Sequence, residues 1–139
     1  MSGAMHAPIA QCRALLRQAD ATMSGLDDSH RALEPKAGTK TAGWLIGHLA
    51  VTGDYGRKIC GRAALCPKEW RAKFNPGTLP SRDAATYPPM AELTGTMHRV
   101  YADLMDAAAS LDAATLAAPN PFAPALADFP TTGEFVAYL

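Results

Sequence analysis

The sequence predicts an all-α fold, an antiparallel four-helix bundle that forms a single domain over residues 1–139. Three segments repeat apolar residues every three or four positions, which is the period of an amphipathic helix packed on a core. No segment shows the alternation of apolar and polar residues that is typical of a half-buried strand. The 139 residues are 48% hydrophobic, so the chain has the length and apolar content of one domain.

The first helix is predicted over residues 9–26. Its apolar residues recur at helical spacing, and they are Ile9, Cys12, Leu15, Leu16, Ala19, Met23 and Leu26. Gly25 and the polar residues after it end the pattern. The segment 34–38 is then a linker, because Pro35 cannot continue a helix.

The second helix is predicted over residues 41–61. One face of it carries Trp44, His48, Val51, Tyr55 and Ile59. Four glycines also lie within it, and each costs up to about 1 kcal/mol of helix propensity relative to alanine. We therefore expect tertiary packing to hold this segment helical, with a neighbouring helix approaching closely at the glycines.

A long connection is predicted over residues 62–89, where prolines and glycines exclude a long regular element. Within it, residues 67–74 are expected to form a short helix with Pro67 in the first turn and Trp70 and Phe74 on one side. Connections of this length are usually functional covers or disordered. The two aromatic residues favour an ordered cover.

The third helix is predicted over residues 90–111, with a stripe that consists of Met90, Leu93, Met97, Val100, Tyr101, Leu104, Ala108 and Leu111. Asp103 and Asp106 lie on the opposite, polar face and are expected to be solvated. His98 falls outside the stripe, so we expect it at the surface. Four prolines follow Asp112, which predicts an extended crossover to the last helix.

The fourth helix is predicted to begin at Thr131, which forms a capping box with Glu134. The residues behind the cap supply about two helical turns, roughly 12 Å at 1.5 Å per residue. The second and third helices each run to about 30 Å by the same rise. A four-helix bundle needs a fourth helix of comparable length, so we expect this helix to continue past Leu139 in the full-length protein.

Composition and charge exclude several classes of partner. Thirteen Lys and Arg balance thirteen Asp and Glu, so the broad positive field that binds nucleic acid is missing. No apolar run approaches the roughly 20 residues that span a bilayer, and the first ten residues do not resemble a signal peptide. Cys12, Cys60 and Cys66 are expected to be unpaired packing residues of a reducing compartment. We expect a cytoplasmic protein with no nucleic-acid or membrane partner.

The segment 43–50, which reads GWLIGHLA, resembles the second helix of the DinB-like family of metal-binding bundles. Its sharpest motif is the pair Trp44 and His48, four residues apart. The segments 74–80 and 131–139 are similar to the family segments that precede the third helix and open the fourth. The order of elements agrees as well, so the resemblance covers most of the chain.

The resemblance implies a divalent metal, often zinc or nickel, held by three histidines. His48 matches the ligand on the second helix, and the other two would follow Leu139 on the fourth helix. On this basis the full-length protein binds the metal, whereas residues 1–139 alone bind none tightly. The resemblance also implies a homodimer and a metal-dependent enzyme for a small molecule, such as a thiol-dependent transferase, an isomerase or a hydrolase. Trp70 and Phe74 would cover its site.

The residues alone leave a second interpretation open. His48 lies on an apolar stripe, where a core histidine with one hydrogen bond is common. The alternative is therefore a non-catalytic dimeric bundle, or a protein that binds a small apolar ligand, with a structural His48. The sequence identifies neither the substrate nor a thiol cofactor.

Overall fold

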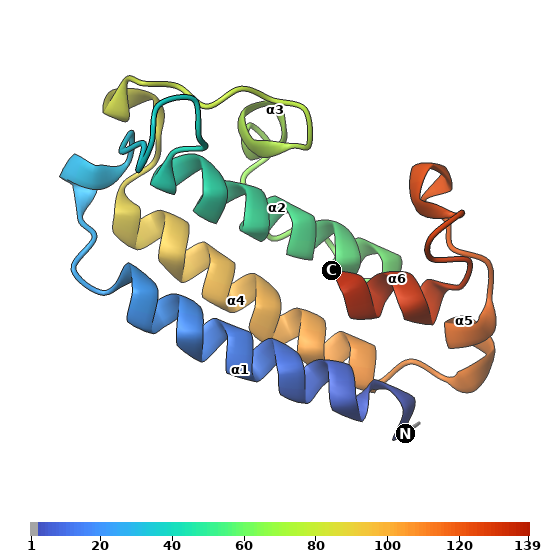
Figure 1. Cartoon of the computed structure of the whole chain (residues 1–139). Helices are drawn as coiled ribbons and strands as arrows, with labels where there is room; N and C mark the ends of the chain where they lie inside the picture. The colour runs from blue at the N-terminus through green and yellow to red at the C-terminus, as the bar shows by residue number, and fades with distance from the viewer. Residues whose placement is uncertain (1–2) are drawn as a thin grey trace.

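The computed structural model describes residues 3–139, and in this range the chain contains six α-helices and no strand. The three long helices are α1 (His6–Met23), α2 (Ala42–Ile59) and α4 (Met90–Ala109), and they lie side by side (Figure 1). The three short ones are α3 (Trp70–Phe74), α5 (Ala113–Ala117) and α6 (Thr132–Tyr138). The predicted all-α bundle is thus confirmed. Within residues 3–139 no helix has the length and apolar content to cross a membrane.

The ends of the helices follow from local and distant caps. The Thr41 side chain accepts a hydrogen bond from the backbone N–H of Trp44 at the start of α2. The predicted capping box of Thr131 and Glu134 is present at the start of α6. At α4 the cap comes from far along the chain, because the backbone N–H of Met90 donates to Asp28 Oδ1 at 2.7 Å. The turn after α1 is thereby tied to α4.

Three predicted segments differ from the structure. The short helix in the long connection is α3 alone and begins at Trp70, not at residue 67, so Pro67 precedes it and does not lie in its first turn. The first helix lies three residues earlier than predicted at both ends, and the chain turns after it at Gly25, which has a φ of +86°. The segment after Asp112 is not an extended crossover, because it contains α5 and a 3-10 turn at Ala123–Ala125. Asp112 caps α5 by accepting from the backbone N–H of Thr115 at 2.7 Å.

The direction of the helices also corrects the expected antiparallel order. Gly53 of α2 lies against Val100 and Tyr101 of α4, and Gly56 lies against Leu104, so the two helices run parallel. The connection 62–89 makes this possible because it returns the chain to the start of α2 before α4 begins. Helices α1 and α6 run in the opposite direction (Figure 1).

The core lies mainly between α2, α3 and α4. Leu93, Met97 and Val100 of α4 are fully buried, as are Trp70 and Phe74 of α3. None of the residues described in α1 is fully buried, although its apolar face packs against the core with half-buried side chains. The helix pair α2 and α4, with α3 packed on α2, therefore carries most of the tertiary packing.

Close packing at Gly47 of α2 predicts that an alanine there destabilises the protein, although alanine is the better helix former. A Cβ added at Gly47 would lie 2.6 Å from the ring of Phe74, whereas one added at Gly95 of α4 would meet only Arg99 Nη1 at 3.8 Å. We expect Gly47→Ala to lower the free energy of unfolding by about 1–3 kcal/mol through overpacking. Gly95→Ala should raise it by up to about 1 kcal/mol through helix propensity. Urea unfolding followed by circular dichroism measures both, and shifts of the same sign would contradict this packing.

Candidate functional site

The structure places His48 in the first half of α2 in a defined orientation. Its ring stacks on Trp44 with centroids 4.6 Å apart and planes 10° from parallel. Its Nδ1 lies 2.8 Å from the carbonyl oxygen of Phe74. A carbonyl oxygen only accepts hydrogen bonds, so Nδ1 carries the proton and, in the neutral ring, Nε2 carries a lone pair. Among residues 3–139 this Nε2 has no hydrogen-bond partner.

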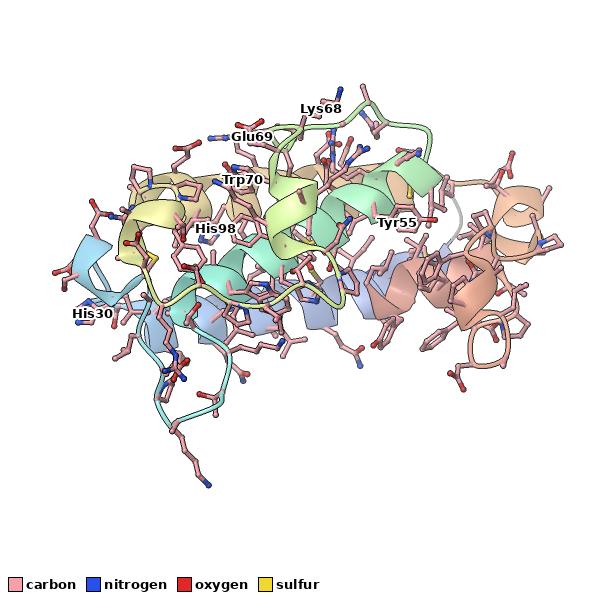
Figure 2. The ribbon with its side chains drawn as sticks, turned by 90° about the horizontal axis from the view of Figure 1, so that it is seen from above. His30, Tyr55, Lys68, Glu69, Trp70 and His98 are labelled. Atoms are coloured by element: carbon pink, nitrogen blue, oxygen red, sulfur yellow. The ribbon has the colours of Figure 1, made fainter. Side chains whose placement is uncertain are left out.

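Helix α3 supplies the carbonyl that orients His48. Figure 2 shows α3, with Trp70, lying over α2. The Phe74 side chain is 0% exposed, and its ring packs on Gly47 and edge-on against Trp70. Trp44 holds the turn after α3 as well, because its Nε1 donates to Thr78 Oγ1 at 2.9 Å. The expected cover is therefore ordered, but its two aromatic side chains are core residues that anchor α3 and do not cover an open cavity.

The other histidines lie elsewhere in the fold. His6 opens α1, and Nδ1 of His30 accepts a hydrogen bond from the backbone N–H of Asp27. His98 on α4 lies at the surface, as expected, with its side chain 42% exposed, and it pairs there with Asp20 at 2.7 Å. Figure 2 shows His30 and His98 on separate elements.

A metal centre is not assembled within the described residues. The structure brings no group of three His, Cys, Asp or Glu side chains together in residues 3–139. The orientation of His48 does fit a single metal ligand, since ligating histidines usually donate their second ring N–H to a carbonyl or carboxylate. The described residues therefore supply one oriented metal ligand, His48, and not a complete metal site.

The three cysteines have the environments of packing residues, as predicted. All are half-buried free thiols, and burial raises the pKa of Cys12 and Cys60 above the ordinary value. Burial, together with the negative charge of Asp54, raises the pKa of Cys66 to about 12. Because the thiolate is the nucleophile, none of these three cysteines is suited to attack a substrate at neutral pH.

A buried ion network was missed by the sequence analysis. Asp54 is 7% exposed and Arg57 is 6% exposed, and Arg57 Nη1 donates to Asp54 Oδ1 at 2.6 Å. Arg57 Nε also donates to Asp103 Oδ2 at 2.6 Å, which joins α2 to α4. Asp103 was expected to be solvated, and this expectation is wrong because its carboxylate is mostly covered and paired. Asp106 is largely solvated, as expected.

The same network holds the start of the long connection. The Asp54 carboxylate accepts hydrogen bonds from the backbone N–H groups of Leu65 and Cys66, at 3.0 Å for the shortest contact with each. Arg57 donates to the carbonyl oxygen of Ala63 at 2.8 Å. These contacts fix the chain that leads into α3, so they act on the position of the Phe74 carbonyl that orients His48.

The fold and the site together define the class of protein. It is an all-α bundle with a carbonyl-oriented histidine on its second long helix. The family model of the DinB superfamily matches residues 9–139, and the chain belongs to this superfamily, as the segment around Trp44 and His48 had indicated. No curated protein and no solved structure matches the chain.

Proposed function

We propose that the protein is a metal-dependent enzyme for a small molecule and that His48 Nε2 is one ligand of its divalent metal, zinc or nickel. The observation that carries the proposal is the hydrogen bond from His48 Nδ1 to the Phe74 carbonyl. This bond fixes the tautomer of the ring and leaves the lone pair of Nε2 free to bind a metal. When bound, such a metal acts as a Lewis acid toward the substrate. The proposal covers a thiol-dependent transferase, an isomerase or a hydrolase.

The remaining ligands are proposed to be two histidines that follow Leu139 in a longer protein. Helix α6 runs antiparallel to α2, and the side chain of Leu139 lies against Gly56. A helix continued from α6 would therefore pass along α2 toward His48, which lies eight residues, or about 12 Å, before Gly56. Residues 1–139 alone are expected to bind no metal tightly.

Elemental analysis tests this proposal with variants of His48. In the longer protein, His48→Ala and His48→Asn should each lose the metal, whereas His98→Ala should keep it. Asparagine can still donate to the Phe74 carbonyl but has no Nε2, so His48→Asn separates ligation from the contact between α2 and α3. Its thermal unfolding midpoint should stay close to that of the parent measured after the metal has been removed by a chelator, because a bound metal stabilises the folded state on its own. Metal retained at full occupancy in His48→Ala would remove His48 from the ligand set.

A non-catalytic homodimer, or a bundle that binds a small apolar ligand, is the second candidate. Two observations favour it: the contacts of His48 with Trp44 and Phe74 also suit a structural histidine, and leucines are exposed along α1 and α2, at Leu15, Leu45 and Leu49. An isologous contact between two copies would cover this apolar surface. Sedimentation velocity should then give a dimer, and a monomer at tens of micromolar would count against it.

A further inference from the structure

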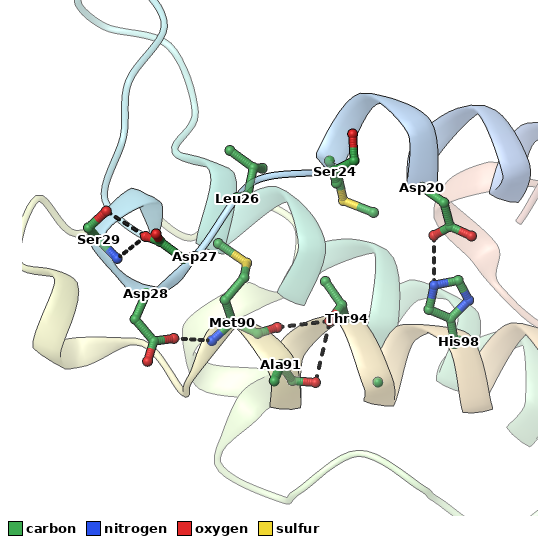
Figure 3. Close-up of a pocket in the computed structure, with 12 residues that line it drawn as sticks. Asp20, Ser24, Leu26, Asp27, Asp28, Ser29, Met90, Ala91, Thr94 and His98 are labelled. Carbon is green, nitrogen blue, oxygen red and sulfur yellow. Dashed lines mark hydrogen bonds and ion pairs between the residues drawn. The ribbon is translucent and has the colours of Figure 1, made fainter.

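A hollow lies away from His48, between the end of α1, the turn after it and the first half of α4 (Figure 3). It has a volume of about 710 Å³. None of the described residues that line it belongs to α2 or α3, so it is separate from the surroundings of His48. Ligand sites in proteins are typically hollows of about 300–1,000 Å³.

The middle of this hollow is apolar. Met90 at the start of α4 is buried, and Met23 and Leu26 are half-buried on the opposite wall. Gly95 leaves the α4 wall open, because a Cβ added there would meet nothing closer than Arg99 Nη1 at 3.8 Å. Close packing explains the glycines of α2 but does not explain Gly95, which lies within a helix and faces the hollow.

Carboxylates lie at both ends of the hollow. Asp20 is at one end, where its Oδ1 pairs with His98 Nε2 at 2.7 Å (Figure 3). Asp27 and Asp28 are at the other, where Asp27 Oδ1 accepts from the backbone N–H of Ser29 and Asp28 Oδ1 accepts from that of Met90. Within residues 3–139, the second oxygen of each of these three carboxylates has no hydrogen-bond partner.

The hollow is acidic although the whole chain has a net charge of zero. Three aspartates are among the described residues that line it, and no Lys or Arg is. Two arginines next to lining residues or their neighbours in the chain have other partners, because Arg31 donates to the carbonyl oxygens of Asp28 and Tyr87 and Arg99 donates to Thr96 Oγ1. The histidines beside the hollow contact only one oxygen of a carboxylate each, His30 that of Asp27 and His98 that of Asp20. The free carboxylate oxygens are therefore available to an external cation.

The distance between the two acidic ends of the hollow sets the length of the ligand that fits it. Met90 lies at the end with Asp28 and His98 at the end with Asp20, and eight residues of helix separate them, about 12 Å along the axis. We propose that this hollow binds a linear aliphatic diamine or polyamine, with an ammonium group at each acidic end and the methylene chain along Met23, Leu26 and Met90. An inorganic cation would meet one end only and would gain nothing from the apolar middle.

Isothermal titration calorimetry of the 139-residue chain tests the proposal with spermidine as the probe and Mg²⁺ as the comparison. Spermidine should bind saturably and more tightly than Mg²⁺. Asp20→Asn should weaken spermidine binding about two- to fivefold, the range expected for one exposed charge pair. Asp128→Asn removes the same charge from a residue outside the hollow and should leave the binding unchanged.

A further variant tests the shape of the hollow. Gly95→Leu should fill the open wall and abolish spermidine binding without lowering the thermal unfolding midpoint, because leucine is the better helix former. The proposal is overturned if spermidine gives no saturable heat or binds no better than Mg²⁺. It is also overturned if Asp128→Asn weakens binding as much as Asp20→Asn, or if Gly95→Leu binds as the parent does.

Discussion

Asp54→Ala is expected to destabilise the protein by about 3–5 kcal/mol, because it breaks a buried ion network from one side. The variant would leave Arg57, which is 6% exposed, with Asp103 as its remaining carboxylate partner. It would also remove the acceptor from the partly buried backbone N–H groups of Leu65 and Cys66, and donors left unsatisfied there carry a desolvation penalty of their own. Urea unfolding followed by circular dichroism measures the loss.

Asp106→Ala is the matched control on α4. Its side chain is 72% exposed and pairs with Arg62, so the loss should stay below about 1 kcal/mol. Asp103→Ala should fall between the two variants, since the Asp103 carboxylate is partly exposed and Arg57 keeps Asp54. Equal stability of Asp54→Ala and Asp106→Ala would show that the network does not hold the connection to α2.

The helices that the sequence predicted best are those that carry a regular apolar stripe within their own segment of the chain. The apolar stripe of α4 matches the buried residues Leu93, Met97, Val100 and Leu104, because a helix on a core repeats its contacts every three or four residues. The parallel order of α2 and α4 has no such signal. It depends on the path of the connection 62–89, which contacts between distant residues determine.

The candidate site was predictable in part. His48 was identified from its spacing to Trp44, but its bond to the Phe74 carbonyl joins residues 26 positions apart and has no pattern in the sequence. Asp54 and Arg57 are three residues apart on a helix, a spacing that is also typical of solvated pairs. Their position on the face that packs on α4 and the connection makes them buried, and only the tertiary structure shows this.

Phe74→Ala should lower the free energy of unfolding by about 3–5 kcal/mol, the usual cost of truncating a fully buried phenylalanine. The ring of Phe74 fills the space above Gly47, meets Trp70 edge-on and stacks on Tyr87 at 6.2 Å between centroids. Its removal leaves a cavity between α3 and α2 and loosens the carbonyl that orients His48. Urea unfolding gives the loss of stability, and nitrogen NMR shifts of the His48 ring report its tautomer.

The two readouts together separate a general loss of packing from a specific effect on His48. Phe129→Ala is the control, because Phe129 is half-buried, lies before α6 and stacks mainly on the exposed Tyr138. It should cost about 1 kcal/mol and leave the His48 shifts unchanged. In Phe74→Ala the shifts should move toward a mixture of tautomers, since Nδ1 loses a fixed acceptor. Unchanged shifts in that variant would mean that the backbone of α3 keeps its place on α2 without the Phe74 ring, and that Asp54 and Trp44 suffice to orient His48.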